Sequence, residues 1–258
     1  MLQIEKILER IALTPDIQNY KPTLETLKLL MKHYLLYVPY ENLDFVLNKE
    51  FSANILNIYE KIVCNNRGGI CYESNTLFAY LLKTLGFSVQ MILAKVEDLT
   101  YIGYDYPHLA LLVKLENEEY LVDVANGQNV REPMPLHDEN YISVAENNEY
   151  KIRNANEEYV LLINHKHKGW HPRYHFTKEV KRVADFAHIF EGKNYEKFSN
   201  HAPLLVTRAL KDGRVTLTNN TVHLKKDGEK KSWEITEKSR NKILNEYFDI
   251  NLNKRDSH

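Results

Sequence analysis

The stretch that decides the fold is Arg67-Gly68-Gly69-Ile70-Cys71-Tyr72-Glu73-Ser74-Asn75, in which a pair of glycines leads into a cysteine. Two adjacent glycines let the backbone turn tightly and let a substrate approach it closely. Leucines then recur at i, i+4 and i+8, which predicts a helix over 73–85 that stops at Gly86. The segment therefore indicates a tight loop that delivers Cys71 to the start of a helix.

Cys71 is the strongest nucleophile candidate in the chain. At a helix start it meets unpaired N–H groups and the positive end of the helix dipole, and Arg67 is close in sequence. All of these favour the thiolate, which is the reactive form of cysteine. Cys64 has no such context and is expected in the core, where most cysteines lie. The two thiols form no C-x-x-C pair, so neither a disulfide framework nor a zinc ribbon is indicated.

Outward from this segment, the pattern predicts helices before it and strands after it. Helices are expected over 4–11 and from Thr23 to just before Pro39. Strands are expected over 88–96, 108–115, 119–124, 158–163 and 173–177, followed by a connecting helix over 180–198. Two hairpins are expected at Asp212-Gly213, between strands 204–209 and 214–217, and at Asp227-Gly228, between strands 222–224 and 232–235. An amphipathic helix over 237–248 closes the chain, and this order gives an α+β fold.

A base and an orienting group for Cys71 follow from the strand pattern. His108 opens one predicted strand and Asp123 ends the next, and 116–119 form a polar turn between them. Hairpin neighbours can bring these side chains together, so that Asp123 holds one ring nitrogen while the other faces Cys71. By itself this order of three residues is weak evidence. A structural histidine and an ordinary turn aspartate fit the pattern as well.

Composition narrows the class of protein. The chain has 258 residues, 34 Lys and Arg against 35 Asp and Glu, and a formal net charge of -1. That balance gives no electrostatic reason to expect nucleic acid or an anionic membrane as partner. The apolar runs are too short to span a bilayer, and the N-terminus does not resemble a signal peptide. We therefore expect a soluble, cytoplasmic globular protein.

Several segments, in the same order, resemble one known family. RGGICYESN at 67–75 resembles the R-G-G-x-C-x-E-x-N nucleophile motif of the arylamine N-acetyltransferases, and PYENL at 39–43 resembles their P-F-E-N-L. PHLAL at 107–111 and LVDV at 121–124 resemble the histidine and aspartate segments of that family. Further agreement comes from Tyr174-His175-Phe176, Asp185-Phe186 and the end of the last helix, so the resemblance covers nearly the whole chain.

The resemblance implies both a fold and a reaction. The fold is α+β, with an N-terminal helical bundle, a central antiparallel β-barrel, a C-terminal α/β lid and a cysteine-protease-like core. Placed on this sequence, the parts are a helical domain over 1–86, a barrel domain over 87–180, and a connecting helix with the lid over 181–258. The implied reaction is ping-pong transfer of an acetyl group from acetyl-CoA to an arylamine, hydrazine or related amine.

The resemblance also assigns roles to particular residues. Cys71 is the implied nucleophile, His108 the general base and acid, and Asp123 the orienting group. Glu41 and Arg67 occupy places the family uses structurally, and a buried ion pair bracing the nucleophile loop is a physical role for them.

This chain departs from the family pattern after Asp123, where Val124-Ala125-Asn126-Gly127 replaces V-G-F-G. In the family that phenylalanine lines the acceptor pocket, so Asn126 and Gly127 are substrate-binding candidates, and so is Tyr40, which replaces a phenylalanine. Asn126 is equally well explained as a residue that turns away and caps a local turn. An amide in place of an aromatic wall would favour smaller or more polar amines.

Two other functional classes and one metal hypothesis accompany this interpretation. A cysteine hydrolase or transglutaminase-like enzyme would use the same three catalytic residues, and a binding module would retain them as a relic. The histidines of the segment 164–175 raise the question of a metal site (His165, His167, His171, His175). With no cysteine or carboxylate among them, a solvated loop is the expectation, and no metal is predicted.

Overall fold

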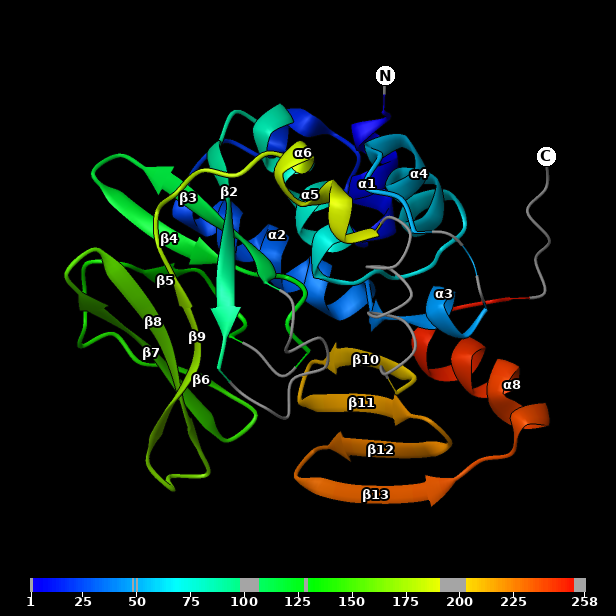
Figure 1. The fold of residues 1–258 in the computed structure, drawn as a ribbon. Coiled ribbons are helices and arrows are strands. Elements are labelled where there is room, and N and C mark those ends of the chain that lie inside the picture. The colour runs from blue at the N-terminus through cyan, green and yellow to red at the C-terminus, as the bar shows by residue number, and fades with distance from the viewer. Residues whose placement is uncertain are drawn as a thin grey trace.

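The computed structural model describes residues 2–47, 49, 51–97, 107–127, 130–190 and 203–252. Within these ranges the chain forms a helical part, an eight-stranded sheet and a five-stranded sheet, in that order along the sequence. Figure 1 shows the helices lying along one side of the larger sheet, with the smaller sheet and the last helix below them. The α+β class and its helical, barrel and lid parts are as predicted.

The helical part is built from short amphipathic segments around one long buried helix. Thr23 caps the second helix by accepting a hydrogen bond from the Thr26 amide at 3.2 Å, and Pro39 follows its end. The long helix packs against two strands of the larger sheet and is buried along most of its length. The elements are α1 (Ile4–Arg10), η1 (Ile17–Asn19), α2 (Leu24–Tyr37), β1 (Tyr40–Glu41), α3 (Leu43–Val46), α4 (Ile55–Tyr59), the π-helical turn η2 (Glu60–Cys64) and α5 (Cys71–Thr84).

The larger sheet is antiparallel and coils into a barrel. Its strand order is β5-β4-β3-β2-β9-β8-β7-β6. Buried and exposed residues alternate along β2, whereas β3 and β8 are buried almost throughout, and α5 packs against β3. The strands are β2 (Ser88–Val96), β3 (His108–Leu115), β4 (Glu118–Val122), β5 (Met134–Pro135), β6 (Ser143–Ala145), β7 (Asn148–Ala155), β8 (Glu158–His165) and β9 (Trp170–Phe176).

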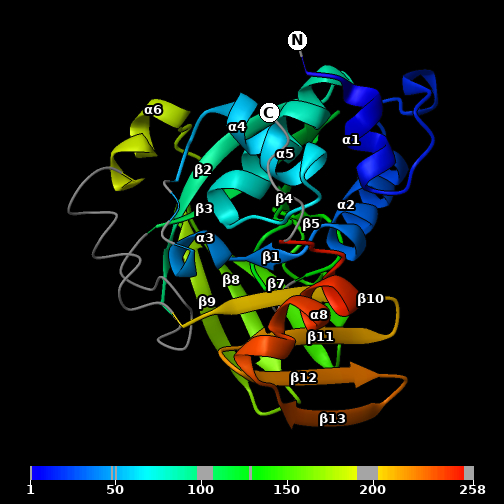
Figure 2. The same ribbon diagram turned by 90° about the vertical axis from the view of Figure 1, so that its right-hand side faces the viewer.

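The smaller sheet forms the lid and takes one strand from the helical part. Its order is β1-β10-β11-β12-β13, and the pair Tyr40↔Thr207 joins β1 to β10. The last helix lies across this sheet, and Leu244 and Phe248 are buried against Val206 and Val215 (Figure 2). The elements are β10 (Leu205–Leu210), β11 (Gly213–Thr218), β12 (Thr221–Lys226), β13 (Glu229–Glu234) and α8 (Glu237–Phe248).

Most predicted elements are present, and the differences have physical causes. β2, β3 and α8 have the predicted bounds, and both lid hairpins form, although the first turn lies at 211–212 because Gly213 already pairs with Leu210. Helix α5 begins two residues earlier than predicted, so that Cys71 is its first residue. The strand β4 ends at Val122, which leaves Asp123 just beyond it. The sequence did not predict β6 and β7, whose polar residues hide the alternation.

Two predictions are wrong within the described residues. The connecting helix expected over 180–198 is reduced to α6 (Val183–Phe186) and η3 (Ala187–Phe190), and 191–198 lie outside the described residues. Cys64 was expected in the core, but it is exposed and free at the end of the π-helical turn. The wider turn of a π-helix shifts side chains relative to an α-helix. It buries Ile62 and leaves Cys64 facing solvent.

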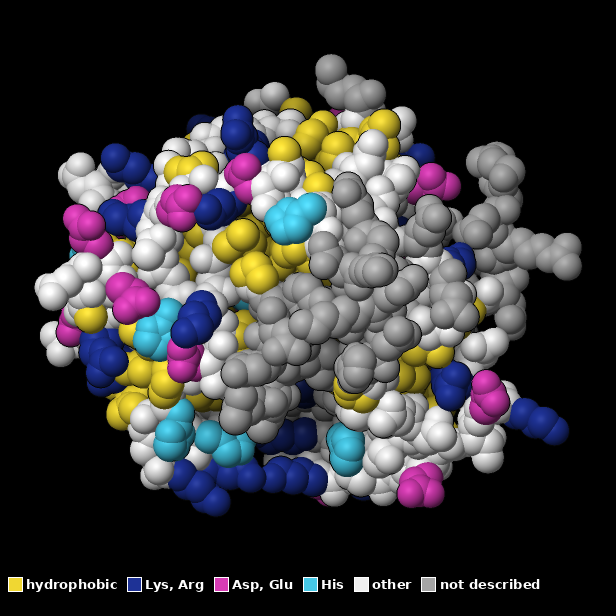
Figure 3. All heavy atoms as spheres, viewed as in Figure 1, with side chains coloured by type: hydrophobic (Ala, Val, Ile, Leu, Met, Phe, Trp, Pro, Cys, Tyr) yellow, Lys and Arg dark blue, Asp and Glu magenta, His cyan; other side chains and the backbone are white. Residues whose placement is uncertain are grey.

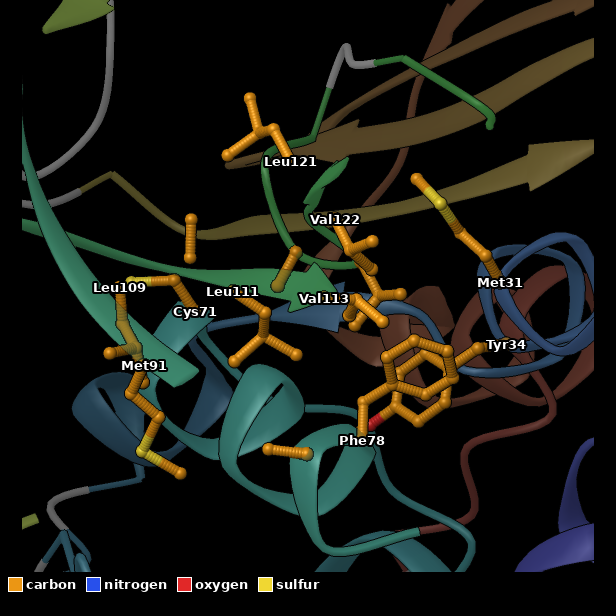
Figure 4. Close-up of a cluster of buried hydrophobic side chains, with 14 of the residues drawn as sticks. Met31, Tyr34, Cys71, Phe78, Met91, Leu109, Leu111, Val113, Leu121 and Val122 are labelled. Atoms are coloured by element: carbon orange, nitrogen blue, oxygen red, sulfur yellow. The ribbon is translucent and has the colours of Figure 1, made fainter. Parts of the chain in front are cut away.

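A single apolar core joins the helices to the barrel. Figure 4 shows the side chains of Cys71 and Phe78, from α5, in one buried cluster with Leu109, Leu111 and other side chains of the barrel strands. The nucleophile candidate therefore lies at the edge of the main core, between the helix and the sheet. Among the described residues, no helix combines the length and apolar character needed to cross a membrane.

Candidate active site

The glycine loop holds Cys71 by lying directly against the backbone of the preceding strand. The Gly69 amide donates to the Pro39 carbonyl at 3.3 Å, and the Glu41 amide donates to the Gly69 carbonyl at 3.2 Å. A Cβ on Gly68 would lie 2.0 Å from the Pro39 oxygen, which no side chain can tolerate. The glycine at 68 is thus required by the close approach of the Pro39 backbone, whereas the sequence suggested the approach of a substrate.

The start of α5 is capped from within the motif. A carboxylate oxygen of Glu73 accepts a hydrogen bond from the Ile70 amide at 3.0 Å, one half of a capping box. Cys71 follows as the first residue of the helix and is only 7% exposed. Its sulfur therefore lies where the unpaired amides of the first turn favour negative charge.

A buried network of five charged side chains braces this loop. Arg67 donates from Nε to Glu41 Oε1 at 2.8 Å and from Nη2 to Asp44 Oδ1 at 2.8 Å. Lys61 contacts the other oxygen of Asp44 at 2.5 Å and both oxygens of Glu73 at 2.8 and 2.9 Å. The expected ion pair between Glu41 and Arg67 is therefore present, as one part of a larger network that ties β1, α3, η2 and α5 together.

The charges of this network are unequal, since three carboxylates share two cations. Burial, together with the nearby Asp44 and Glu41, raises the pKa of Glu73 to about 7 in spite of the Lys61 ammonium. The Arg67 guanidinium is engaged by Glu41 and Asp44, so its charge is balanced there. Its role is to brace the loop.

The barrel brings His108 and Asp123 together. His108 Nε2 and Asp123 Oδ2 are 2.8 Å apart, and both side chains are completely buried. The β3–β4 hairpin produces this contact because His108 begins β3 and Asp123 follows the end of β4. With Nε2 bound to Asp123, the Nδ1 edge of the ring is left to face Cys71.

Three further groups fix the Asp123 carboxylate. Asn75 Nδ2 donates to Oδ1 at 3.1 Å, the Ala125 amide donates to the same oxygen at 3.0 Å, and the Tyr174 hydroxyl donates to Oδ2 at 3.2 Å. The Asn75 side chain also bonds the backbone of β3 at Leu109, at 2.7 Å. Asn75 thereby couples the nucleophile helix to both catalytic candidates on the barrel.

Sequence reasoning assigned no function to these supporting residues, although signals were present. Asn75 is the last residue of the nucleophile motif, and Tyr174 belongs to one of the segments that carry the family resemblance. Tyr72 was also missed. Its hydroxyl donates to the Pro107 carbonyl and so fixes the residue just before His108.

The surroundings of His108 favour its protonated form. Burial alone would lower the pKa of His108, but the negative charges of Asp123 and Cys71 and their hydrogen bonds outweigh it and raise the pKa to about 10. Burial alone would raise the pKa of Asp123, but the charge of His108 and three hydrogen bonds lower it. The His108 imidazole can therefore be protonated at neutral pH, held between the Asp123 carboxylate and Cys71.

The substrate-binding candidates lie around this centre in different environments. Tyr40 is half-buried, and burial together with the charge of Cys71 raises the pKa of its phenol, which places it beside the nucleophile. Gly127 turns the chain with φ +54° and lies close to Thr207 of the lid. Asn126 is 1% exposed, and its amide oxygen accepts from Arg173 Nη2 at 2.8 Å. The buried Arg173 guanidinium therefore holds the side-chain amide of Asn126 in place.

The clustered histidines spread over a turn and two strand ends. His167 lies 3.5 Å from Glu149 and His175 lies 3.6 Å from Glu158, on different parts of the barrel. In the ranges that the structure describes, no group of three or more His, Cys, Asp or Glu side chains is arranged to hold a metal ion.

Comparisons with known proteins identify the family of this chain. A family model described as N-acetyltransferase matches residues 23–257, which defines the class of the protein as an acetyl-transferring enzyme. An arylamine N-acetyltransferase of Escherichia coli is 32% identical over 200 residues, covering 76% of this chain and 70% of the relative. The chain belongs to the arylamine N-acetyltransferase family.

Solved structures lead to the same fold. The arylamine N-acetyltransferase of Salmonella typhimurium superposes with a TM-score of 0.85 at 25% identity, covering 100% of this chain and 94% of that one. A Bacillus cereus enzyme with a Cys-His-Glu triad gives a TM-score of 0.81 at 25% identity, covering 98% and 100%. The third position of the candidate triad is an aspartate here, so the acid varies among proteins of this fold.

The charge network yields the first prediction. Lys61→Met leaves Glu73 and one side of Asp44 without their cation, and breaking a buried ion pair costs about 3 kcal/mol. The free energy of unfolding, measured in urea, should fall by that amount in Lys61→Met. Lys61→Arg, which keeps the cation, should retain most of the wild-type stability. Lys83→Met, an exposed change at the far end of α5, serves as the matched control. Equal stability of Lys61→Met and Lys83→Met would show that the network does not brace the loop.

The second prediction concerns pH. Because the pKa of His108 is raised in the folded state, its contribution to stability is complete below its unfolded pKa of about 6.5 and declines as pH rises toward 10. The difference in unfolding free energy between the wild type and His108→Gln should therefore shrink between pH 6.5 and pH 10. Urea titrations at three pH values measure it. A difference that stays constant over this range would contradict the buried imidazolium.

Proposed function

We propose that this enzyme transfers an acetyl group from acetyl-CoA through a thioester on Cys71 to an arylamine, hydrazine or related amine, by a ping-pong mechanism. The observation that carries the proposal is the buried 2.8 Å hydrogen bond between His108 and Asp123, beside a cysteine at the first position of a helix. Membership of the family supports the choice of donor and acceptor. The cytoplasmic location inferred from the sequence stays a prediction.

In the first half-reaction the Cys71 thiolate attacks the acetyl carbonyl carbon of the donor. A carbon–sulfur bond forms to Cys71, the bond to the CoA sulfur breaks, and His108 supplies the proton that the leaving thiolate takes up. Asp123 keeps the imidazolium oriented and balances its charge. The products are acetyl-Cys71 and free CoA.

In the second half-reaction the acceptor amine attacks the thioester carbon. His108, now neutral, removes a proton from the amine nitrogen, the bond to the Cys71 sulfur breaks, and the thiolate–imidazolium pair is restored. Proton and electron pairs balance over the two halves, so the reaction needs no redox partner or metal-bound intermediate.

The acceptor side of the site is proposed to consist of Tyr40, Asn126 and Gly127. Tyr40 presents a phenol beside the nucleophile, and Gly127 leaves the turn after Asp123 without a side chain. Asn126 acts through its backbone and through Arg173, because its amide oxygen is bonded to that guanidinium. An amide held in this way offers less apolar surface than an aromatic ring, which favours polar amines over hydrophobic ones.

The thioester gives the direct test of the proposed function. With acetyl-CoA and no acceptor, intact-protein mass spectrometry should show one acetyl group, and peptide mapping should place it on Cys71. Cys64 is the internal control, because it is exposed and free and lies outside the candidate triad. An acetyl group on Cys64, or no thioester at all, would refute the assignment of the nucleophile.

A second test addresses the orienting group. Asp123→Asn keeps the shape but removes the charge that stabilises the His108 imidazolium, so acetyl transfer should fall by about 100-fold or more. Circular dichroism should show an unchanged fold. Asp138→Asn, in an exposed loop, is the matched control. Near wild-type turnover in Asp123→Asn would make Asp123 a structural residue only.

A further inference from the structure

A β-bulge in β9 redirects two neighbouring side chains. The consecutive residues Leu161 and Leu162 of β8 pair with Tyr174 and Pro172, so Arg173 is the extra residue of the bulge. Neighbouring residues of a regular strand point to opposite faces of the sheet. Here Arg173 and Tyr174 are both buried, at 8% and 1% exposure. The bulge therefore turns both side chains inward, as bulges beside active sites often do.

The burial of Arg173 is unusual for a charged side chain. Lys and Arg side chains are spread over the outer surface in Figure 3, where water solvates them. A buried guanidinium loses that solvation and is stable only where the protein supplies hydrogen bonds in its place. The contacts that Arg173 makes are therefore specific features of this fold.

Arg173 and Tyr174 both bind the turn that follows β4. Arg173 Nη2 donates to the side-chain oxygen of Asn126 at 2.8 Å and to the Asn126 carbonyl at 3.3 Å. The Tyr174 hydroxyl donates to Asp123 Oδ2 at 3.2 Å. Between these two contacts, the Ala125 amide donates to Asp123 Oδ1 at 3.0 Å. The strand β9 therefore holds the turn at both of its ends.

The orientation of the Asn126 amide depends on Arg173. The amide is almost fully buried, and its nitrogen Nδ2 forms no hydrogen bond with a residue that the structure describes. The bond from Arg173 to Oδ1 is therefore the contact that selects the direction of the amide. The phenylalanine of the family pattern would offer the guanidinium no side-chain acceptor at this position. Asn126 and Arg173 thus form a matched pair.

The pair also lies beside the hydroxyl that binds Asp123. Burial, and then the charge of Asp123 and its hydrogen bond, raise the pKa of Tyr174. The Arg173 charge and the Asn126 amide oppose that rise. The centroids of the Tyr174 and His108 rings are 5.4 Å apart. Contacts therefore continue from the bulge through the turn to the candidate triad.

We propose that Arg173 is a positioning residue for acetyl transfer: by binding Asn126, it fixes the turn that holds the Asp123 carboxylate in place. This inference rests on the proposed function for the reaction in which Asp123 takes part. It gives the departure from the family pattern at Asn126 a role in supporting the triad, in addition to its place on the acceptor side.

The test removes this contact from either side. Arg173→Met deletes the guanidinium and keeps a long unbranched side chain, while Asn126→Leu deletes its side-chain acceptor. In each variant the rate constant for transfer from acetyl-Cys71 to an arylamine should fall by about tenfold, because catalysis is sensitive to small losses of orientation. Arg153→Met, an exposed change on β7, is the matched control and should leave the rate unchanged.

A pH series separates positioning from a purely structural role. Transfer from acetyl-Cys71 becomes faster with rising pH as His108 loses its proton and can act as a base. Burial lowers the pKa of His108 and the charge of Asp123 raises it, so a less firmly held Asp123 lowers that pKa. The midpoint of the rise should therefore move to lower pH in both single variants and stay in place in Arg153→Met. Acetyl-Cys71 is formed first, freed of donor and mixed with an arylamine that stays neutral across the series.

A double-mutant cycle tests the route through Asn126. Adding Arg173→Met to Asn126→Leu should change the rate by less than about twofold, because the contact is already lost, whereas independent roles would multiply the two losses. Both single variants remove the same bond, so the midpoint can be measured in one of them if the other does not fold. Multiplied losses, or reduced stability in urea with an unchanged midpoint, would overturn the proposal. Failure of the wild type to form acetyl-Cys71 would instead refute the proposed function.

Discussion

The buried charge network around Lys61 and Arg67 is the constraint on which the rest of the site depends. Three short elements of the helical part, β1, α3 and η2, have little apolar surface to hold them in register against α5. The network replaces that packing with directional contacts, because each carboxylate accepts from a defined donor. Such a network is a costly way to gain stability but a specific way to fix geometry. Its last member, Glu73, caps the helix that begins with Cys71, so the position of the sulfur follows from the network.

The barrel supplies the other half of the site through register. A one-residue slip in the β3–β4 hairpin would turn His108 or Asp123 to the opposite face. The residue that secures the match between the two halves is Asn75, which bonds the backbone of β3 and the Asp123 carboxylate from the nucleophile helix. These two hydrogen bonds of Asn75 therefore fix the distance between α5 and the barrel. The geometry of the candidate site in this chain therefore depends on a polar contact across an otherwise apolar interface.

The sequence predicted features that depend on residues close together in the chain, and it missed contacts between residues that are far apart in the chain. Local signals identified the glycine loop, the helix after it, the strands β2 and β3 and the last helix, because turn residues and apolar spacing determine them. The His108–Asp123 contact was inferred from a hairpin, which is also local. Lys61 was not found, because its side chain enters the network through a π-helical turn that leaves no sequence signature. The same turn explains why Cys64 is exposed, and Tyr174 reaches Asp123 only through the order of the barrel strands.

Barrel and lid are joined by ion pairs and hydrogen bonds around Glu146, whereas the main core is apolar. Glu146 accepts from both Arg131 and Arg214, and its backbone carbonyl accepts from Lys225. The Glu146 carboxylate thus anchors the guanidiniums of Arg131 and Arg214, whereas its neutral backbone carbonyl holds the Lys225 ammonium. Anchoring by a carbonyl secures the position of Lys225 without cancelling its charge. The contact between lid and barrel therefore converges on one residue, Glu146, whose carboxylate and backbone carbonyl together hold three cationic side chains.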